Sequence, residues 1–153
     1  MKLTRMLSCT LLIALVFSLS VSAHAAQPAP EEGLSPLGSA YINYYVAYCH
    51  DDGNGDLIVE FDISGTGPIM DEIGAVTVDI MEKESASSSY SVVHTFVASA
   101  TDGMLGEDAR SWRGGVEYDG TIGYNYKAIV TFWVEKDNAG DSRVYTTDPV
   151  TLE

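Results

Sequence analysis

The sequence predicts an all-β sandwich of about seven strands, and three observations lead to this fold class. Several segments alternate apolar and polar residues with the period of two that a half-buried strand needs. Steps rich in glycine, asparagine and aspartate separate these segments at short intervals and favour tight turns. Beyond residue 38, no segment repeats apolar residues at helical spacing. Short alternating strands between turns are typical of two packed antiparallel sheets.

The first 25 residues have the features of a secretory signal peptide. Lys2 and Arg5 precede an apolar run from Leu11 to Val21, and Ala23 and Ala25 supply the small residues of a cleavage site after Ala25. The apolar run is shorter than the ~20 residues that a membrane span needs. We therefore expect a secreted, extracellular protein without a membrane span.

The mature chain should consist of a leader and one domain. Residues 26–38 contain three prolines and show no periodicity, which predicts a flexible leader, and residues 39–153 form the sandwich domain. The whole chain carries 8 basic and 22 acidic residues, a net charge of −14. Cleavage removes two basic residues and no acidic one, so six remain against 22 and the net charge becomes −16. This charge argues against nucleic acid and anionic membranes as partners.

Cleavage also leaves Cys49 as the single cysteine, because Cys9 lies in the signal peptide. An intramolecular disulfide is then impossible, although the destination is oxidising. Cys49 lies in an apolar, tyrosine-rich run, where we expect a small core residue rather than a reactive thiol.

The predicted strands are residues 40–50, 57–64, 75–81, 90–98, 111–118, 124–135 and 143–150. The inward side chains should be Leu57, Val59, Phe61 and Ile63 in the second strand, and Val76, Val78 and Ile80 in the third. Residues 82–89 form a polar loop, and residues 137–141 form a turn. Residues 99–109 show no strand pattern, which predicts a long connection between the sheets.

The sixth strand is the best defined. Tyr124, Tyr126, Ala128, Val130, Phe132 and Val134 share one face. Tyr126 follows the Asp119-Gly120 turn, at the place where a sandwich positions a tyrosine whose hydroxyl bonds to upstream backbone. This stretch resembles strand F of an immunoglobulin-like or fibronectin type III domain. Ala128 stands where immunoglobulin domains carry a cysteine, and the usual early-strand tryptophan is absent.

Three stretches also resemble a family of small secreted proteins of unknown function from Gram-positive gut bacteria. They are the tyrosine-rich run from Ala40 to His50, the Thr-Asp-Gly-Met-Leu-Gly stretch at 101–106, and the Tyr-Asp-Gly-Thr-Ile-Gly-Tyr stretch at 118–124. The resemblance implies no activity.

Residues 51–56 leave two interpretations open. Asp52, Asn54 and Asp56 have the spacing of the first three oxygen ligands of a calcium loop, but Leu57 and Ile63 stand where that loop requires Gly and Glu. A hairpin turn accounts for the same residues. We expect no cofactor.

The sequence does not predict an enzyme. His50 and His94 are the histidines left after cleavage, and neither has zinc-site spacing or a nucleophile motif beside it. The expected role is an extracellular binding or adhesion module for a protein or glycan. A self-assembling structural or effector protein and an unrecognised hydrolase are the alternatives.

Strand alternation also predicts a binding face. If Tyr126 and Phe132 point inward, Ile129 and Trp133 point outward, and Met81 and Tyr145 could lie beside them. An exposed aromatic and aliphatic patch of this kind marks an interface. The alternative is that the leader or residues 99–109 cover the patch.

Overall fold

The computed structural model describes residues 39–84 and 89–153. It contains nine strands and, within these residues, no helix, which confirms the all-β sandwich. The strands are β1 (Ile42–Asp51), β2 (Asp56–Gly65), β3 (Met70–Lys83), β4 (Ser91–Val97), β5 (Leu105–Ala109), β6 (Ser111–Asp119), β7 (Asn125–Lys136), β8 (Ala139–Thr146) and β9 (Val150–Thr151). The predicted signal peptide and leader lie outside the described residues, as does part of the predicted loop at 82–89.

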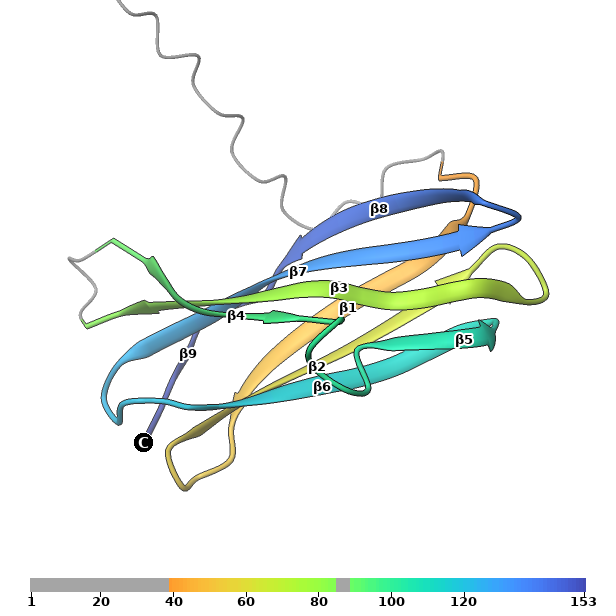
Figure 1. Cartoon of the computed structure of the whole chain (residues 1–153). Helices are drawn as coiled ribbons and strands as arrows, with labels where there is room; N and C mark the ends of the chain where they lie inside the picture. The colour runs from red at the N-terminus through yellow and green to blue at the C-terminus, as the bar shows by residue number, and fades with distance from the viewer. Residues whose placement is uncertain (1–38, 85–88) are drawn as a thin grey trace, which may run out of the picture.

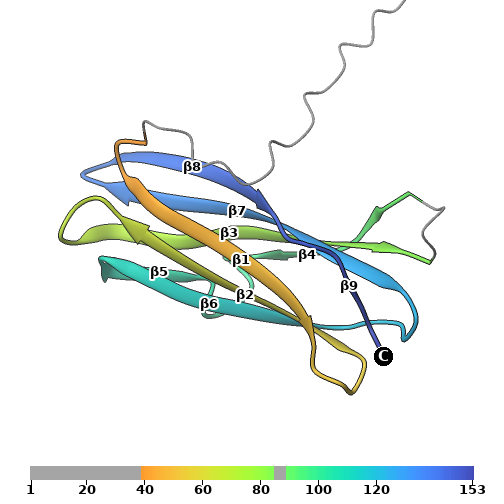
Figure 2. The same cartoon turned by 180° about the vertical axis from the view of Figure 1, so that it is seen from behind.

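The strands form two antiparallel sheets packed face to face. The smaller sheet has the order β1-β2-β6, and the larger has the order β4-β3-β7-β8. Two short strands extend the edges of the larger sheet, because β5 pairs with the first half of β3 and β9 pairs with the start of β7. Figure 1 views the molecule from the larger sheet, and Figure 2 from the smaller one.

The core lies between the sheets and consists of the alternate side chains that each strand turns inward. The predicted inward residues of β2 are all buried, and so are Tyr126, Ala128, Val130, Phe132 and Val134 of β7. The rings of Phe61 and Phe132 meet edge to face across the two sheets, with centroids 6.0 Å apart. Period-two alternation therefore identified the central strand of each sheet correctly.

The β3 strand differs from its prediction in length and in phase. It begins at Met70 instead of residue 75, and its pairing with β7 shifts register between Ala75 and Thr77. This bulge inserts Val76 as an extra residue, so Val76 is only half-buried while Val78 and Ile80 are fully buried.

The predicted connection at 99–109 is wrong in its second half, which forms β5. This strand pairs with the added N-terminal part of β3, where Ile73 lies opposite Gly106. A five-residue edge strand with two acidic residues carries too weak an alternation to be recognised from sequence.

The turn between β7 and β8 is shorter than predicted. Lys136 pairs with Ala139, which leaves only Asp137 and Asn138 in the loop. Both have positive φ, 54° and 61°, as a two-residue hairpin turn that matches the strand twist requires. The shorter loop moves the start of the last long strand from residue 143 to residue 139.

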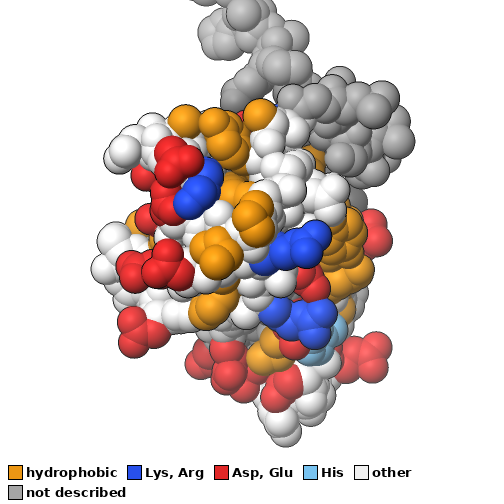
Figure 3. All heavy atoms as spheres, turned by 90° about the vertical axis from the view of Figure 1, so that its right-hand side faces the viewer, with side chains coloured by type: hydrophobic (Ala, Val, Ile, Leu, Met, Phe, Trp, Pro, Cys, Tyr) orange, Lys and Arg blue, Asp and Glu red, His pale blue; other side chains and the backbone are white. Residues whose placement is uncertain are grey.

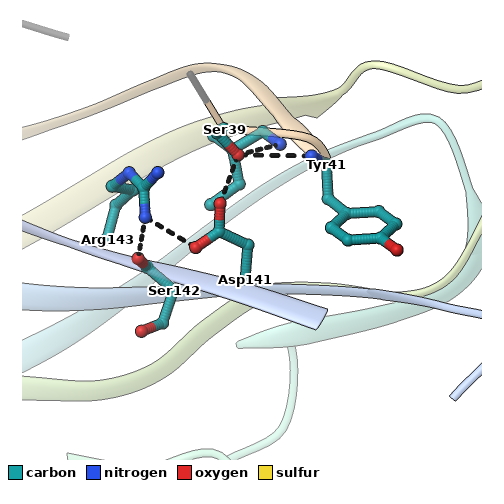
Figure 4. Close-up of polar contacts among 6 residues, drawn as sticks. Ser39, Tyr41, Asp141, Ser142 and Arg143 are labelled. Carbon is teal, nitrogen blue, oxygen red and sulfur yellow. Dashed lines mark hydrogen bonds and ion pairs between the residues drawn. The ribbon is translucent and has the colours of Figure 1, made fainter. Parts of the chain in front are cut away.

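The start of the domain is attached to β8 by a polar cluster (Figure 4). The Ser39 hydroxyl donates to Asp141 Oδ2 at 2.5 Å and accepts the backbone N–H of Ile42 at 2.7 Å. Arg143 Nη1 donates to Asp141 Oδ1 at 2.6 Å and to the Ser142 carbonyl at 2.7 Å. Asp141 thus joins the entry to β1 with the edge of the larger sheet.

Across residues 39–84 and 89–153, no helix has the length and apolar character needed to cross a membrane.

Candidate functional site: the outer face of the smaller sheet

The outer face of the smaller sheet presents two exposed tyrosines from β1. Ala47 and Cys49 point toward the core, so alternation turns Tyr44 and Tyr48 to solvent. Their side chains are 48% and 58% exposed, which makes them the most exposed tyrosines among the described residues. Large aromatic side chains normally lose most of their surface on folding, so an exposed pair on one strand marks a candidate binding surface.

Antiparallel pairing places residues of β1, β2 and β6 opposite one another, so that each set of three forms a row across this face. Three neighbouring rows carry side chains of mixed chemistry: Val46, Asp62 and Arg113; Tyr48, Glu60 and Gly115; His50, Ile58 and Glu117. Arg113 Nη2 donates to Asp62 Oδ2 at 2.7 Å. Glu60 and Glu117 form no ion pair with any residue in the described ranges. The face therefore combines aromatic rings with free carboxylates and one paired guanidinium.

A hollow of about 350 Å³ opens on this face above Gly114 and Gly115. It is lined by Ile58, Glu60, Arg113, Gly114, Gly115, Val116 and Glu117. Residue 115 stays without a side chain because a Cβ there would lie 2.8 Å from the Val59 carbonyl oxygen. Because β2 and β6 approach closely at Gly115, no side chain fills the bottom of the hollow. The Glu60 and Glu117 carboxylates line it.

The hydroxyl group of Tyr44 is protonated at neutral pH. The pKa of Tyr44 is raised, first by desolvation and then by the neighbouring Tyr48 hydroxyl and the Asp62 carboxylate. Each tyrosine therefore offers an aromatic face and a hydroxyl group to a ligand.

Figure 3 shows the end of the sandwich that carries the β7–β8 turn, where charged and polar side chains separate the hydrophobic ones. Scattered apolar side chains of this kind are normal for a protein surface.

The face predicted from sequence belongs to the larger sheet. Trp133, Ile129 and Met81 all point outward there, as strand alternation required, and all three are half-buried. The Trp133 ring lies over Gly140 of β8, at a position that a Cβ on that glycine would occupy. Neighbouring residues of the same sheet thus cover part of the ring.

Tyr145 does not belong to that face. It pairs with Val130, which points to the core, and its ring meets Tyr45 edge-on with centroids 6.2 Å apart. The five-residue turn expected from sequence would have placed Tyr145 opposite Trp133. The two-residue turn shifts the register by an odd number of positions, and this moves the side chain to the opposite face.

The predicted calcium loop forms the β1–β2 hairpin. Asp52 Oδ1 accepts the backbone N–H of Asn54 at 2.7 Å and that of Asp56 at 3.2 Å, and Oδ2 accepts the Asn54 side-chain amide at 2.8 Å. The bonds from Asn54 are the largest cause of the lowered pKa of Asp52. In the part of the chain that the structure describes, no cluster of three or more His, Cys, Asp or Glu side chains is placed to hold a metal.

Tyr126 lies at the corner between β6 and β7. It is fully buried, and its hydroxyl accepts the backbone N–H of Thr121 at 2.8 Å. The same hydroxyl donates to the Glu82 carboxylate on β3. Burial first, and then this hydrogen bond, raise the pKa of Tyr126.

The sequence contains local signals for the tyrosine face. Small residues at 47 and 49 alternate with Tyr48 and His50, which sets the inward face of β1. The Gly114-Gly115 pair inside a strand indicates close approach of neighbouring backbone. The rows across three strands could not be read from the sequence, because they depend on pairing partners.

No protein-family model matches this sequence, and comparisons with curated proteins and with solved structures found no significant similarity. The geometry of the outer face is therefore the basis for a functional assignment.

Proposed function

We propose that this protein is a secreted binding module that recognises a glycan through the outer face of its smaller sheet. The observation that carries the proposal is the pair of exposed tyrosines on β1, which share the outer face of the smaller sheet with a hollow that Glu60 and Glu117 line. Binding sites combine a few apolar or aromatic contacts with a small number of placed polar groups, and this face has both.

The chemistry of the face suits a sugar. The negative face of a tyrosine ring attracts the partly positive C–H groups on one side of a sugar ring. Glu60 and Glu117 can accept hydrogen bonds from sugar hydroxyls, and Arg113 can donate to them. The hollow has a volume of about 350 Å³ and is open to solvent, so it would contact one side of a sugar unit.

Within the class of all-β sandwiches, we propose an immunoglobulin-like or fibronectin type III-like fold, and the strand order supports this proposal. Strands β1, β2 and β6 face β4, β3, β7 and β8, with crossovers between the sheets as in a Greek key. The corner tyrosine at the start of β7 supports the same assignment. The departure is β5, which pairs with β3 instead of joining the smaller sheet.

The two histidines of the described residues have different surroundings. The His94 ring packs against Phe96 and Tyr118, with centroids 4.4 and 5.7 Å away. His50 lies exposed at the margin of the tyrosine face. No hydrogen bond links either histidine to a serine, threonine or cysteine of the described residues.

A glycan array probed with the purified protein tests the proposal. We expect binding that falls at least tenfold in both Tyr44→Ala and Tyr48→Ala, because truncation of an aromatic hot-spot residue costs about 1.4 kcal/mol or more. Val144→Ala is the matched control, since Val144 is 55% exposed on the opposite sheet. Binding that survives both tyrosine variants, or that is lost in the control, would refute this face as the site.

A second candidate function is self-assembly through β4. This edge strand pairs with β3 alone within the described residues, and no Asp, Glu, Lys or Arg occurs in its sequence. Its hairpin with β3 projects from the body of the sandwich (Figures 1 and 2). Val92 and Val97 are 54% and 41% exposed, and an uncharged, apolar edge is a template for strand pairing. Analytical ultracentrifugation of the wild type and Thr95→Lys tests it, because a dimer formed by this edge should dissociate in the variant.

A further inference from the structure

Two lysine side chains converge on one aromatic ring on the outer face of the larger sheet. Lys83 Nζ lies 4.7 Å and Lys127 Nζ 4.5 Å from the centre of the Tyr90 ring. Lys83 pairs with Asn125 and Lys127 with Met81, so the two lysines are diagonal neighbours on adjacent strands. Both ammonium groups thus lie near the same ring.

These two positive charges have no carboxylate partner among the described residues. Three of the other basic side chains do have one: Arg113 with Asp62, Lys136 with Asp71, and Arg143 with Asp141. A cation–π contact at an exposed site is worth only about 0.5–1 kcal/mol, and neighbouring like charges oppose each other. Lys83 and Lys127 thus place two positive charges beside one ring in a chain with a net charge of −14.

The groups around the lysines include both donors and acceptors. Asn125, opposite Lys83, uses its Oδ1 to accept the Thr151 hydroxyl at 2.9 Å, which leaves its amide N–H groups for another partner. The Asp79 carboxylate on the same face already accepts the Thr95 hydroxyl at 2.5 Å. An oxyanion would meet two ammonium groups and an amide here, beside the apolar wall of a half-buried tyrosine.

We propose that Lys83, Lys127 and Tyr90 form an anion-binding site for a carboxylate or sulfate group. The bound oxyanion would lie between the two ammonium groups and neutralise their repulsion. The site is on the sheet opposite the tyrosine face, so it does not depend on the proposed glycan site. The same contacts would hold an anion free in solution or the acidic substituent of a sugar.

A titration of the full chain with sodium sulfate tests the proposal, with sodium chloride at matched ionic strength as the reference. The readout is the change in the NMR signals of Lys83, Tyr90 and Lys127. We expect saturable changes with sulfate and not with chloride. Lys83→Gln and Lys127→Gln should each raise the apparent Kd for sulfate about fivefold, which corresponds to about 1 kcal/mol. Lys136→Gln is the matched control, because Lys136 is already paired with Asp71 at 2.7 Å.

The outcomes separate the alternatives. Sulfate changes no larger than those with chloride would overturn the site, and so would an unchanged Kd in both lysine variants whose circular dichroism matches the wild type. Tyr90→Leu should also weaken binding, and full affinity in that variant would remove the ring from the site. A second titration with a uronic acid assigns the source: tighter binding than sulfate supports an acidic sugar, and equal binding supports a free anion at the same residues.

Discussion

Replacing Tyr126 with phenylalanine should destabilise the protein, because one hydroxyl group joins three parts of the fold. The ring is fully buried at the start of β7. Its hydroxyl accepts the Thr121 N–H from the preceding turn and donates to Glu82 on β3. Tyr126→Phe keeps the ring in place and leaves both partners without this contact.

The expected cost is about 2 kcal/mol. A neutral hydrogen bond contributes about 0.5–1.5 kcal/mol and one to a charged group about 1.5–3 kcal/mol. Glu82 is only half-buried, so water can replace part of the second contact, which limits the total to about 1–3 kcal/mol. For a domain of this size, 1 kcal/mol corresponds to a shift in Tm of about 4 °C.

Urea unfolding followed by circular dichroism measures this free energy. Tyr124→Phe is the matched control, because Tyr124 is a half-buried tyrosine whose hydroxyl forms no hydrogen bond with a described residue. Its loss should cost less than about 0.5 kcal/mol. If the two variants have the same stability, the hydroxyl of Tyr126 does not hold the corner. A double-mutant cycle of Tyr126→Phe with Glu82→Gln should show coupling of about 1 kcal/mol, because the two side chains form one hydrogen bond.

Three further predictions concern the hairpin, the acid range and the thiol. Asp52→Ala should lower the free energy of unfolding by about 0.5–1 kcal/mol, because it removes hydrogen bonds of the turn. The Tm of the wild type should be equal in calcium and in chelator, whereas calcium bound at 100 times its Kd would add about 2.7 kcal/mol of stability. The Ser39 hydroxyl first, and the Arg143 charge after it, hold the pKa of Asp141 below its ordinary value. The stability that Asp141 contributes is therefore present above about pH 4 and lost as pH falls further, and Asp141→Asn should flatten this part of the stability profile. Burial raises the pKa of the Cys49 thiol, which contacts the Thr147 hydroxyl, so a thiol reagent at neutral pH should react with the unfolded chain and not with the native one; fast reaction of the native protein would contradict this.

The sequence by itself determined the fold class and the inward faces of the central strands. A period of two needs no knowledge of partners, so Phe61 and Phe132 could be assigned to the core from their own strands alone. The position of Tyr126 after a turn likewise depends on local sequence. The Asp52 hairpin could be expected because its glycine and asparagine steps favour positive φ.

Only the tertiary structure decided which residues share a surface. Tyr145 changed faces because the β7–β8 turn contains two residues and not five, and a shift by an odd number of positions reverses every side chain of a strand. Tyr48 of β1 and Gly115 of β6 lie in one row because β2 lies between these two strands and pairs with both. Lys83 and Lys127 meet at Tyr90 although 43 positions separate Lys83 from Lys127 in the chain. Such neighbours depend on register and on strand order, which arise from packing between distant segments and leave no periodic signal within any one of them.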